Sequence, residues 1–439
     1  MLKTLVGAFK NKDIRKKILY TLMILVIVRV GSLLPIPGVD TEYFSSLLSG
    51  INTGDLSYLS AFTGGSFERM SLFALSITPY ITSSIIMQLL TIAIPKLEEM
   101  QKEGEDGRKK IAAITRYVTI ALALIESIAM AVGFGRSGLI KGYQGFSTLH
   151  YIVSIIVVVA ALTAGSAMLM WLGERITENG VGNGISIVLL INIISGMPSD
   201  FATLYSTFVA PKTPAKGVLA AVIILAILIV MVVLVCFLQD GERRIPVQYS
   251  QKVSGRRTVG GQSTNIPLKV NTAGVMPIIF ASSLMQFPVI IAQLFGKSYE
   301  WTRYLSSSYW CRVEAPKYSI GLLVYIVLLI IFAYFYTSIT FNPIEVADNL
   351  KKAGGVIPGI TPGKSTSEYL NKILNYIVFI GAVGLLIIAL IPIMCTGFFN
   401  ASVSFGGTSI IIIVGVVLET LKQIESQMCN RYYKGFLSE

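Results

Sequence analysis

Residues 62–90 read FTGGSFERMSLFALSITPYITSSIIMQLL. The stretch opens with a Gly-Gly turn and a charged pair, and then continues without a charge as far as Pro95, which is long enough to cross about 30 Å of hydrocarbon. The same stretch carries polar side chains that are costly against lipid, namely Ser76, Thr78, Thr82, Ser83, Ser84 and Gln88. We therefore expect one face of this span to meet water or other helices.

The whole chain has the composition of a membrane protein. Of its 439 residues 53% are hydrophobic and only 14% are charged, and the mean hydropathy is +0.69, which is more apolar sequence than a soluble core can bury. We predict ten spans, near residues 18–34, 72–94, 117–135, 151–172, 182–197, 217–238, 273–295, 320–339, 373–394 and 407–421. The predicted fold class is an all-α multi-pass membrane protein.

Lys and Arg are concentrated in alternate loops. They gather at the amino terminus, in residues 95–116, 239–272 and 340–372, and in the tail 422–439. Because cytoplasmic loops carry the excess of Lys and Arg, both termini are predicted to be cytoplasmic. The net charge of +12 is then concentrated on one face, where it would attract anionic lipid or an acidic or RNA-bearing partner. Orientation of the spans alone is the competing explanation.

The predicted spans fall into two groups of five. Residues 1–197 form the N-terminal half, residues 198–216 a hinge loop rich in Pro, Thr and Ser, and residues 217–421 the C-terminal half. An odd number of spans in each half inserts the halves in opposite orientations, as in an inverted repeat with a path at its interface. We see no residue-level repeat between the halves, so this expectation concerns topology only.

Residues that carry chemistry are sparse and scattered. The four cysteines lie far apart, at Cys236, Cys311, Cys395 and Cys429, without metal or redox spacing. Cys311 and Cys395 share the predicted outer side, but nothing in the spacing requires a disulfide. The single histidine is His150. With no nucleophile, acid–base pair or metal cluster in view, we predict no enzyme activity, no metal and no cofactor.

The predicted spans are almost free of charge in their interior. A transporter coupled to ions would keep titratable groups near the bilayer midplane, but the clear charges inside the spans are Arg29, late in the first span, and Glu126, in the middle of the third. Ile77 and Ile81 instead place branched apolar side chains one helical turn apart on the same face. Such a pair fits a hydrophobic constriction that excludes ions by dewetting. Ordinary helix packing is the alternative reading of this pair.

The loops between the predicted spans carry distinctive motifs, which are LLPIPGVD after the first span, KEGEDGRKKI (102–111), WLGERITENGVGNGIS (171–186), GGQSTNIPLKVN (260–271), FNPIEVADNLKKAGG (341–355) and FGGTS (405–409). These motifs resemble those of the SecY family, the channel subunit of the Sec protein translocase. The resemblance runs nearly end to end. It implies a protein-conducting channel that translocates unfolded secretory proteins, releases transmembrane segments sideways into the membrane, and is driven by an external motor or ribosome.

The resemblance assigns a plug and a central pore. The plug would be residues 56–67, with Leu59, Phe62, Gly64 and Gly65 among its residues. Pro79 is expected to bend the second span where plug and gate motions are absorbed. The apolar pore ring carried over from the family falls on Ile77, Ile81, Ile185, Leu189, Ile279 and Ile412.

The resemblance also implies a lateral gate, of which the second span forms one wall and at which the third span packs beside it, with Thr82, Gln88 and Glu126 as gate residues. A carboxylate within a span is costly to expose to lipid, so Glu126 is expected to turn inward. We expect a hydrogen bond from Thr82 or Gln88 to Glu126 that holds the gate shut. A carboxylate that points into an aqueous funnel is the alternative.

The two long basic loops, residues 239–272 and 340–372, resemble a docking platform for a ribosome or the SecA motor. The candidate docking residues are Arg243, Arg244, Arg256, Arg257, Lys351 and Lys352. Ile344 and Thr361 depart from the family pattern, because bacterial relatives usually carry arginine there. The other implied partners are the small membrane subunits SecE and SecG, signal sequences, nascent polypeptides and the lipid of a bacterial cell membrane.

Two other classes of function compete with a channel. A secondary transporter for an amphipathic solute would require a polar site at the midplane, which the sequence does not provide. A membrane scaffold that assembles partners and conducts nothing would not need an apolar ring. Crosslinking of a stalled secretory precursor to Ile81 and Ile279 would discriminate among the three.

Overall fold

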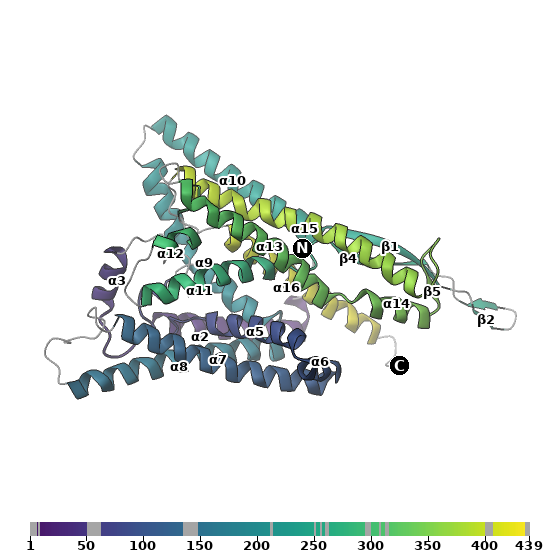
Figure 1. Ribbon diagram of the computed structural model, residues 1–439, viewed down its shortest axis with the longest axis horizontal. Helices are drawn as coiled ribbons and strands as arrows, with labels where there is room; N and C mark the ends of the chain where they lie inside the picture. The colour runs from purple at the N-terminus through teal and green to yellow at the C-terminus, as the bar shows by residue number, and fades with distance from the viewer. Residues whose placement is uncertain are drawn as a thin grey trace.

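The structure is a computed structural model that describes residues 7, 9–50, 63–134, 148–210, 214–249, 252–254, 257–259, 263–294, 300–306, 309–311, 316–399 and 407–434. Most helices run roughly along the long axis of the molecule, and the strands gather at one end (Figure 1). The helices of the first half are α2 (Lys12–Leu33), α3 (Thr41–Gly50), α5 (Thr78–Ala93), α6 (Pro95–Lys102), α7 (Glu105–Phe134), α8 (Thr148–Asn179) and α9 (Gly184–Leu204).

The second half contains helices and strands. Its helices are α10 (Pro214–Asp240), α11 (Met276–Leu294), α12 (Glu300–Leu305), α13 (Ile320–Thr340), α14 (Pro343–Lys352), α15 (Lys364–Phe399) and α16 (Gly407–Lys434). Its strands are β1 (Glu242–Tyr249), β2 (Lys252–Ser254), β3 (Arg257–Val259), β4 (Ser263–Lys269) and β5 (Gly355–Val356). The expected all-α class is therefore right for the apolar helices and wrong for these loops.

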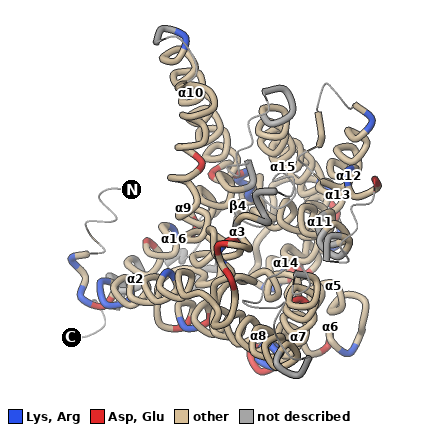
Figure 2. Tube along the Cα trace, turned by 90° about the vertical axis from the view of Figure 1, so that its left-hand side faces the viewer, with Lys and Arg blue, Asp and Glu red and all other residues tan. Residues whose placement is uncertain are grey.

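Six helical stretches in the described part of the chain are long and apolar enough to cross a membrane. They are Glu105–Gly133, Tyr151–Asn179, Gly184–Val209, Lys216–Asp240, Pro316–Lys352 and Lys364–Cys395. The pair α5 and α6, bent by 100° at its break, makes a seventh if it is one span. Figure 2 shows long stretches of helix without a charged residue, and α10 projects away from the others. The fold is thus a helical multi-pass membrane fold.

The apolar side chains that do not face lipid pack into clusters within each half. In the first half, Phe44 of α3, Phe67 and Met70 pack against Met130 of α7 and Leu162 of α8. In the second half, helices α10, α11, α13, α15 and α16 share a cluster that contains Val235, Ile278, Leu329, Leu385 and Ile411. Each half therefore has its own apolar core.

The stretch between the halves is more helical than the sequence predicts. Residues 198–216 were expected to form a hinge loop, but α9 continues through Pro198 and is followed by a π-helical turn, Tyr205–Val209. A proline inside a helix removes one backbone donor without ending the helix when the flanking turns remain bonded. The described part of the predicted hinge loop is therefore largely helical.

The two basic loops fold together into one body, which we call the loop unit (β1, β4, β5 and α14). The three-stranded sheet has the order β4-β1-β5, with β1 antiparallel to both neighbours. Ile245 and Val247 of β1 are buried against Leu350 of α14 and Leu370 of α15. Because buried and exposed residues alternate along β1 with a period of two, one face of the strand packs on the helices. Figure 1 shows β5 and α14 beside α15 at the same end.

Candidate functional site

The six residues expected to form a pore ring meet in a single apolar cluster, which we call the ring cluster. Ile77, Leu189, Ile279 and Ile412 are at most 5% exposed, and Ile81 and Ile185 are partly buried against them. The cluster takes Val28 from α2 and Leu169 from α8 as well. It joins α2, α5, α8 and α9 of the first half to α11 and α16 of the second half. The structure therefore brings all six together at the interface between the halves.

The glycine-rich motif before α9 positions Ile185. Asn183 caps the helix, because its Oδ1 accepts hydrogen bonds from the backbone N–H groups of Ile185 at 3.2 Å and Ser186 at 3.5 Å. The N–H of Gly184 donates to Thr177 Oγ1 at 2.9 Å, and a Cβ at Gly184 would collide with the carbonyl oxygen of Gly173. Gly184 thus lets α9 start in close contact with α8.

Helix α5 begins immediately after Ile77, six residues later than the predicted span. The N–H groups of Tyr80 and Ile81 donate to the carbonyl oxygen of Ile77 at 3.0 and 3.1 Å. Pro79 lies in the first turn, where its fixed φ and missing N–H favour helix initiation. The expected bend at Pro79 is therefore wrong. The sharp bend lies at the other end of α5, where Ile94 is extended ahead of Pro95.

The second half contributes Ile279, on α11, and Ile412, on α16, to the ring cluster. Asn271 Nδ2 donates to the carbonyl oxygen of Gly274 at 3.0 Å in the turn that leads into α11. In α16 the neighbouring isoleucines separate, because successive side chains of a helix point about 100° apart. Ile411 is buried in the core of the second half, whereas Ile412 is buried in the ring cluster.

The predicted plug lies only partly within the described residues. Leu59 and Phe62 fall outside them, whereas Gly64 and Gly65 have φ values of +60° and +79°, which favour glycine. Gly64 lies against α9, since its carbonyl oxygen accepts from Ser195 Oγ at 3.4 Å. Phe67 packs edge-on against Phe44, with ring centroids 5.9 Å apart. The end of the predicted plug is therefore held between α9 and the core of the first half.

The expected hydrogen bond between α5 and Glu126 is not formed. Thr82 Oγ1 donates to the carbonyl oxygen of Thr78 at 3.1 Å, and Gln88 Oε1 is buried without a hydrogen-bond partner among the described residues. No hydrogen bond or ion pair of Glu126 is present in the part of the chain that the structure describes. A side chain that bonds to its own helix, as Thr82 does, needs no partner across the interface.

A different polar contact joins α5 to α7. Ser83 Oγ donates to the carbonyl oxygen of Thr115 at 2.9 Å, and Ser83 is fully buried. Sequence reasoning missed this bond. The buried positions of α5 are Pro79, Ser83, Met87 and Thr91, spaced by four residues. That period places Ser83 on the packed face of the helix and could have identified it.

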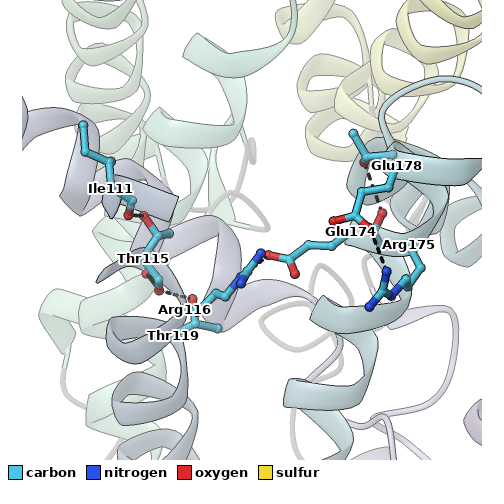
Figure 3. A network of polar contacts seen from close by, with 10 residues as sticks. Ile111, Thr115, Arg116, Thr119, Glu174, Arg175 and Glu178 are labelled. Atoms are coloured by element: carbon cyan, nitrogen blue, oxygen red, sulfur yellow. Dashed lines mark hydrogen bonds and ion pairs between the residues drawn. The ribbon is translucent and has the colours of Figure 1, made fainter. Parts of the chain in front are cut away.

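An ion pair joins α7 to α8 near the ring cluster (Figure 3). Arg116 Nε lies 2.7 Å from Glu174 Oε1, and the two side chains point toward each other. On the neighbouring turns, Thr115 and Thr119 bond to carbonyl oxygens of their own helix, and Arg175 pairs with Glu178. The Arg116 side chain is half exposed, so this pair adds little stability.

The loop unit carries the candidate docking residues. Arg243 and Arg244 are exposed on β1, and Lys351 and Lys352 are exposed at the end of α14. Because β5 follows α14 directly and pairs with β1, these two basic pairs belong to one folded body. Arg256 lies outside the described residues, and only the backbone of Arg257, in β3, is described.

The departures from the family pattern and the cysteines can also be placed. Ile344, on α14, is 65% exposed, and Thr361 is exposed in the turn before α15. Cys311 and Cys395 are free thiols, as is Cys236. Within the described ranges no group of three or more His, Cys, Asp or Glu residues could hold a metal ion.

Comparisons with known proteins agree with this geometry. The SecY family model matches residues 71–421. The protein translocase subunit SecY of Streptomyces galbus is 45% identical over 446 residues, which cover 100% of both chains. Among solved structures, one described as a protein conducting channel matches with a TM-score of 0.61 at 17% identity, covering 94% of this chain and 92% of that one.

A second solved structure, Sec61 in the canine ribosome-channel complex from the endoplasmic reticulum, matches with a TM-score of 0.58. Its identity is 17%, and the match covers 94% of this chain and 92% of that one. Identity at this level shows the fold, whereas full-length identity of 45% to a curated relative shows the family. The chain belongs to the SecY family.

Proposed function

We propose that this chain is the channel subunit of a protein translocase, which conducts unfolded secretory proteins across the bacterial cell membrane and releases transmembrane segments into it. The observation that carries the proposal is the ring cluster, in which six residues from four separate segments meet between the halves. An apolar constriction hinders ions by dewetting and offers a passing chain no fixed hydrogen-bond partner. The channel is a conduit rather than an enzyme and needs no cofactor of its own.

Photo-crosslinking tests this function. A photoreactive amino acid at Ile81 or Ile279 should crosslink to a secretory precursor stalled during translocation. The control probe is Val222, which is 60% exposed on α10 and should face lipid. Crosslinks at Val222 only, or none at the ring positions while translocation proceeds, would contradict a path through the ring cluster and favour a scaffold.

The proposed topology has ten spans. Six spans are the long apolar stretches, and the α5–α6 pair is a seventh. Helices α2, α11 and α16 supply the other three, so that each half has five spans. The halves are then inverted relative to each other around the pore, and both termini are cytoplasmic. Impermeant thiol labelling of single cysteines tests this, since Lys12→Cys and Lys422→Cys should react only from the cytoplasmic side.

The proposed plug is residues 56–67, at the outer side of the ring cluster. The support is the contact of Gly64 with α9, beyond Leu189 along the same helix. Deleting residues 56–62 spares Phe67, which belongs to the core of the first half. In reconstituted bilayers this deletion should raise the ion conductance of the resting channel. A deletion variant as silent as the parent over a range of voltages would remove the plug assignment.

The proposed lateral gate lies between α5 and α7, with Thr82, Gln88 and Glu126 at its lining. The support is that few polar bonds join these two helices. The bond from Ser83 to the carbonyl oxygen of Thr115 is a buried one. Glu126→Leu should lower the hydrophobicity that a model segment needs before it leaves into lipid, because the gate becomes less polar. Glu126→Gln, which keeps the polarity, should shift the threshold less. Superimposable insertion curves for all three proteins would exclude Glu126 from gating.

The proposed partners fit the loop unit and the membrane surface. A ribosome or the SecA motor would bind the exposed basic residues Arg243, Arg244, Lys351 and Lys352, and SecE and SecG would bind the membrane helices. The support is the exposure of both basic pairs on one folded body. Copurification of the solubilised channel with small membrane subunits tests the second part of this proposal.

A further inference from the structure

The segment before α5, residues 63–77, is anchored to α2 and α8 by backbone and apolar contacts. The N–H of Leu72 donates to the carbonyl oxygen of Leu34 at 2.9 Å, and the Phe73 ring lies against Gly31 of α2, where a Cβ would overlap it. The carbonyl oxygen of Leu72 also lies against Gly165 of α8. These contacts hold the segment against α2 and α8.

The contacts of the same segment with α9 include two polar ones. Asn192 Nδ2 donates to Ser76 Oγ at 3.1 Å, and both residues are buried, with exposed fractions of 2% and 1%. Ser195 Oγ, nearly one turn further along α9, donates to the carbonyl oxygen of Asn192 at 2.8 Å and lies 3.4 Å from the carbonyl oxygen of Gly64. Because Ser195 has one proton to share, the bond between Asn192 and Ser76 is the stronger polar contact between α9 and the segment.

Ser76 has an unusual backbone for its residue type. Its φ is +53°, in the left-handed region that favours glycine, and a serine there is strained. The next residue is Ile77, which precedes α5 and belongs to the ring cluster. The conformation of Ser76 therefore sets both the start of α5 and the position of one ring residue.

Asn192 is equally unusual for its surroundings. It lies three residues after Leu189, so the two side chains lie on neighbouring positions of one helix face and both are buried near the ring cluster. Its Oδ1 is buried and has no hydrogen-bond partner within the ranges that the structure describes. A buried amide is costly in an apolar setting, and the bond to Ser76 is what its Nδ2 gains there. Packing alone would favour an apolar side chain at this position.

We propose that Ser76 and Asn192 form a positioning pair that stabilises the resting arrangement of the ring. The bond ties the element that carries Ile77 and Ile81 to the element that carries Ile185 and Leu189. When the segment 63–77 moves away from α9, Asn192 loses this bond, so the pair favours the closed channel. The inference rests on the proposed function, because it assumes that the ring cluster is the barrier of a channel.

A double-mutant cycle tests the pair. Asn192→Ala, Ser76→Ala and the double variant are reconstituted as full-length chains in planar bilayers, and the resting ion conductance is measured. Each single variant should raise the open fraction by about 3- to 16-fold, the range that one hydrogen bond in a membrane interior supports. The double variant should equal the single variants rather than multiply them, because both remove the same bond.

Two controls separate positioning from general loss of structure. Ser166→Ala removes a buried hydroxyl of α8 that has no hydrogen-bond partner in the described part of the chain, and it should leave the conductance unchanged. Ser76→Gly also deletes the hydroxyl but relieves the backbone strain, so its folded protein should be at least as heat-stable as Ser76→Ala while its conductance is raised. Thermal unfolding of every variant is followed in parallel.

The outcomes are distinct. Conductance that rises in both single variants without a further rise in the double variant supports the pair. Unchanged conductance in Asn192→Ala, or independent effects that multiply, overturns it. If a stalled precursor still crosslinks to Ile81, such a result removes only the pair, whereas failure of that crosslink removes the proposed path itself.

Discussion

The ring cluster and the loop unit are both assembled from distant segments, but different interactions hold them. In the loop unit, β1 pairs with β4 over seven residue positions, from Glu242 opposite Lys269 to Gln248 opposite Ser263. In the ring cluster the contacts between elements are mainly apolar side chains. Apolar contacts are non-directional, so the elements can separate without breaking backbone hydrogen bonds. Directional backbone bonds therefore hold the loop unit, whereas the ring cluster is held by contacts that can separate more easily.

Breaking the loop unit should have the largest effect. Val247→Asp places an unpaired charge at a fully buried position of β1, at a cost of about 4 kcal/mol or more. Hydrogen exchange of the β1 amides should accelerate strongly while the spans remain protected. Gln248→Asp, at the adjacent exposed position, is the matched control. Slow exchange in Val247→Asp would show that the sheet does not depend on its buried face.

Two neighbouring isoleucines of α16 allow the ring cluster to be compared with the core of the second half. Ile411→Ala and Ile412→Ala each remove a buried side chain and should each lower the free energy of unfolding by about 3 kcal/mol. Only Ile412 packs in the ring cluster, so only its variant should increase the resting ion conductance. Equal conductance in the two variants would show that the ring cluster is not the barrier.

Charge reversal tests the surface of the loop unit without disturbing its core. Replacing both Arg243 and Arg244 by Glu should weaken binding of a ribosome or SecA by about tenfold at low salt, and the difference should shrink at high salt. Lys372→Glu, an exposed residue of α15 outside the sheet, is the control. Affinities that match the parent at low ionic strength would exclude the two arginines from the docking surface.

The ion pair between α7 and α8 should have the smallest effect. Arg116→Gln removes the bond to Glu174 and should lower the free energy of unfolding by no more than about 1 kcal/mol, because Arg116 is half exposed. Arg175→Gln, which removes a pair within α8, should cost less still. Chemical unfolding at two salt concentrations measures both. A loss of several kcal/mol in Arg116→Gln would mark this pair as a main link between the helices.

Local pattern accounts for much of what could be predicted. Uninterrupted apolar runs identify membrane helices, since the length of hydrocarbon to be crossed is fixed. The residues of β1, ERRIPVQY, alternate between exposed and buried, a pattern that is typical of a strand, although only a docking role is predicted for its arginines. The predicted bend at Pro79 is wrong because a proline bends a helix only in its interior, and Pro79 lies in the first turn of α5.

By itself, the sequence determined the membrane class of this protein, its apolar helices and, through its motifs, the six residues of the ring. Only the tertiary structure decided that those residues meet, that the two basic loops share a sheet, and that Asn192 bonds to Ser76 rather than Thr82 to Glu126. The physical reason is the sequence separation over which each kind of interaction acts. Propensity and apolar periodicity act over a few neighbouring residues, whereas the partner of a buried polar group is set by which distant segment packs against it.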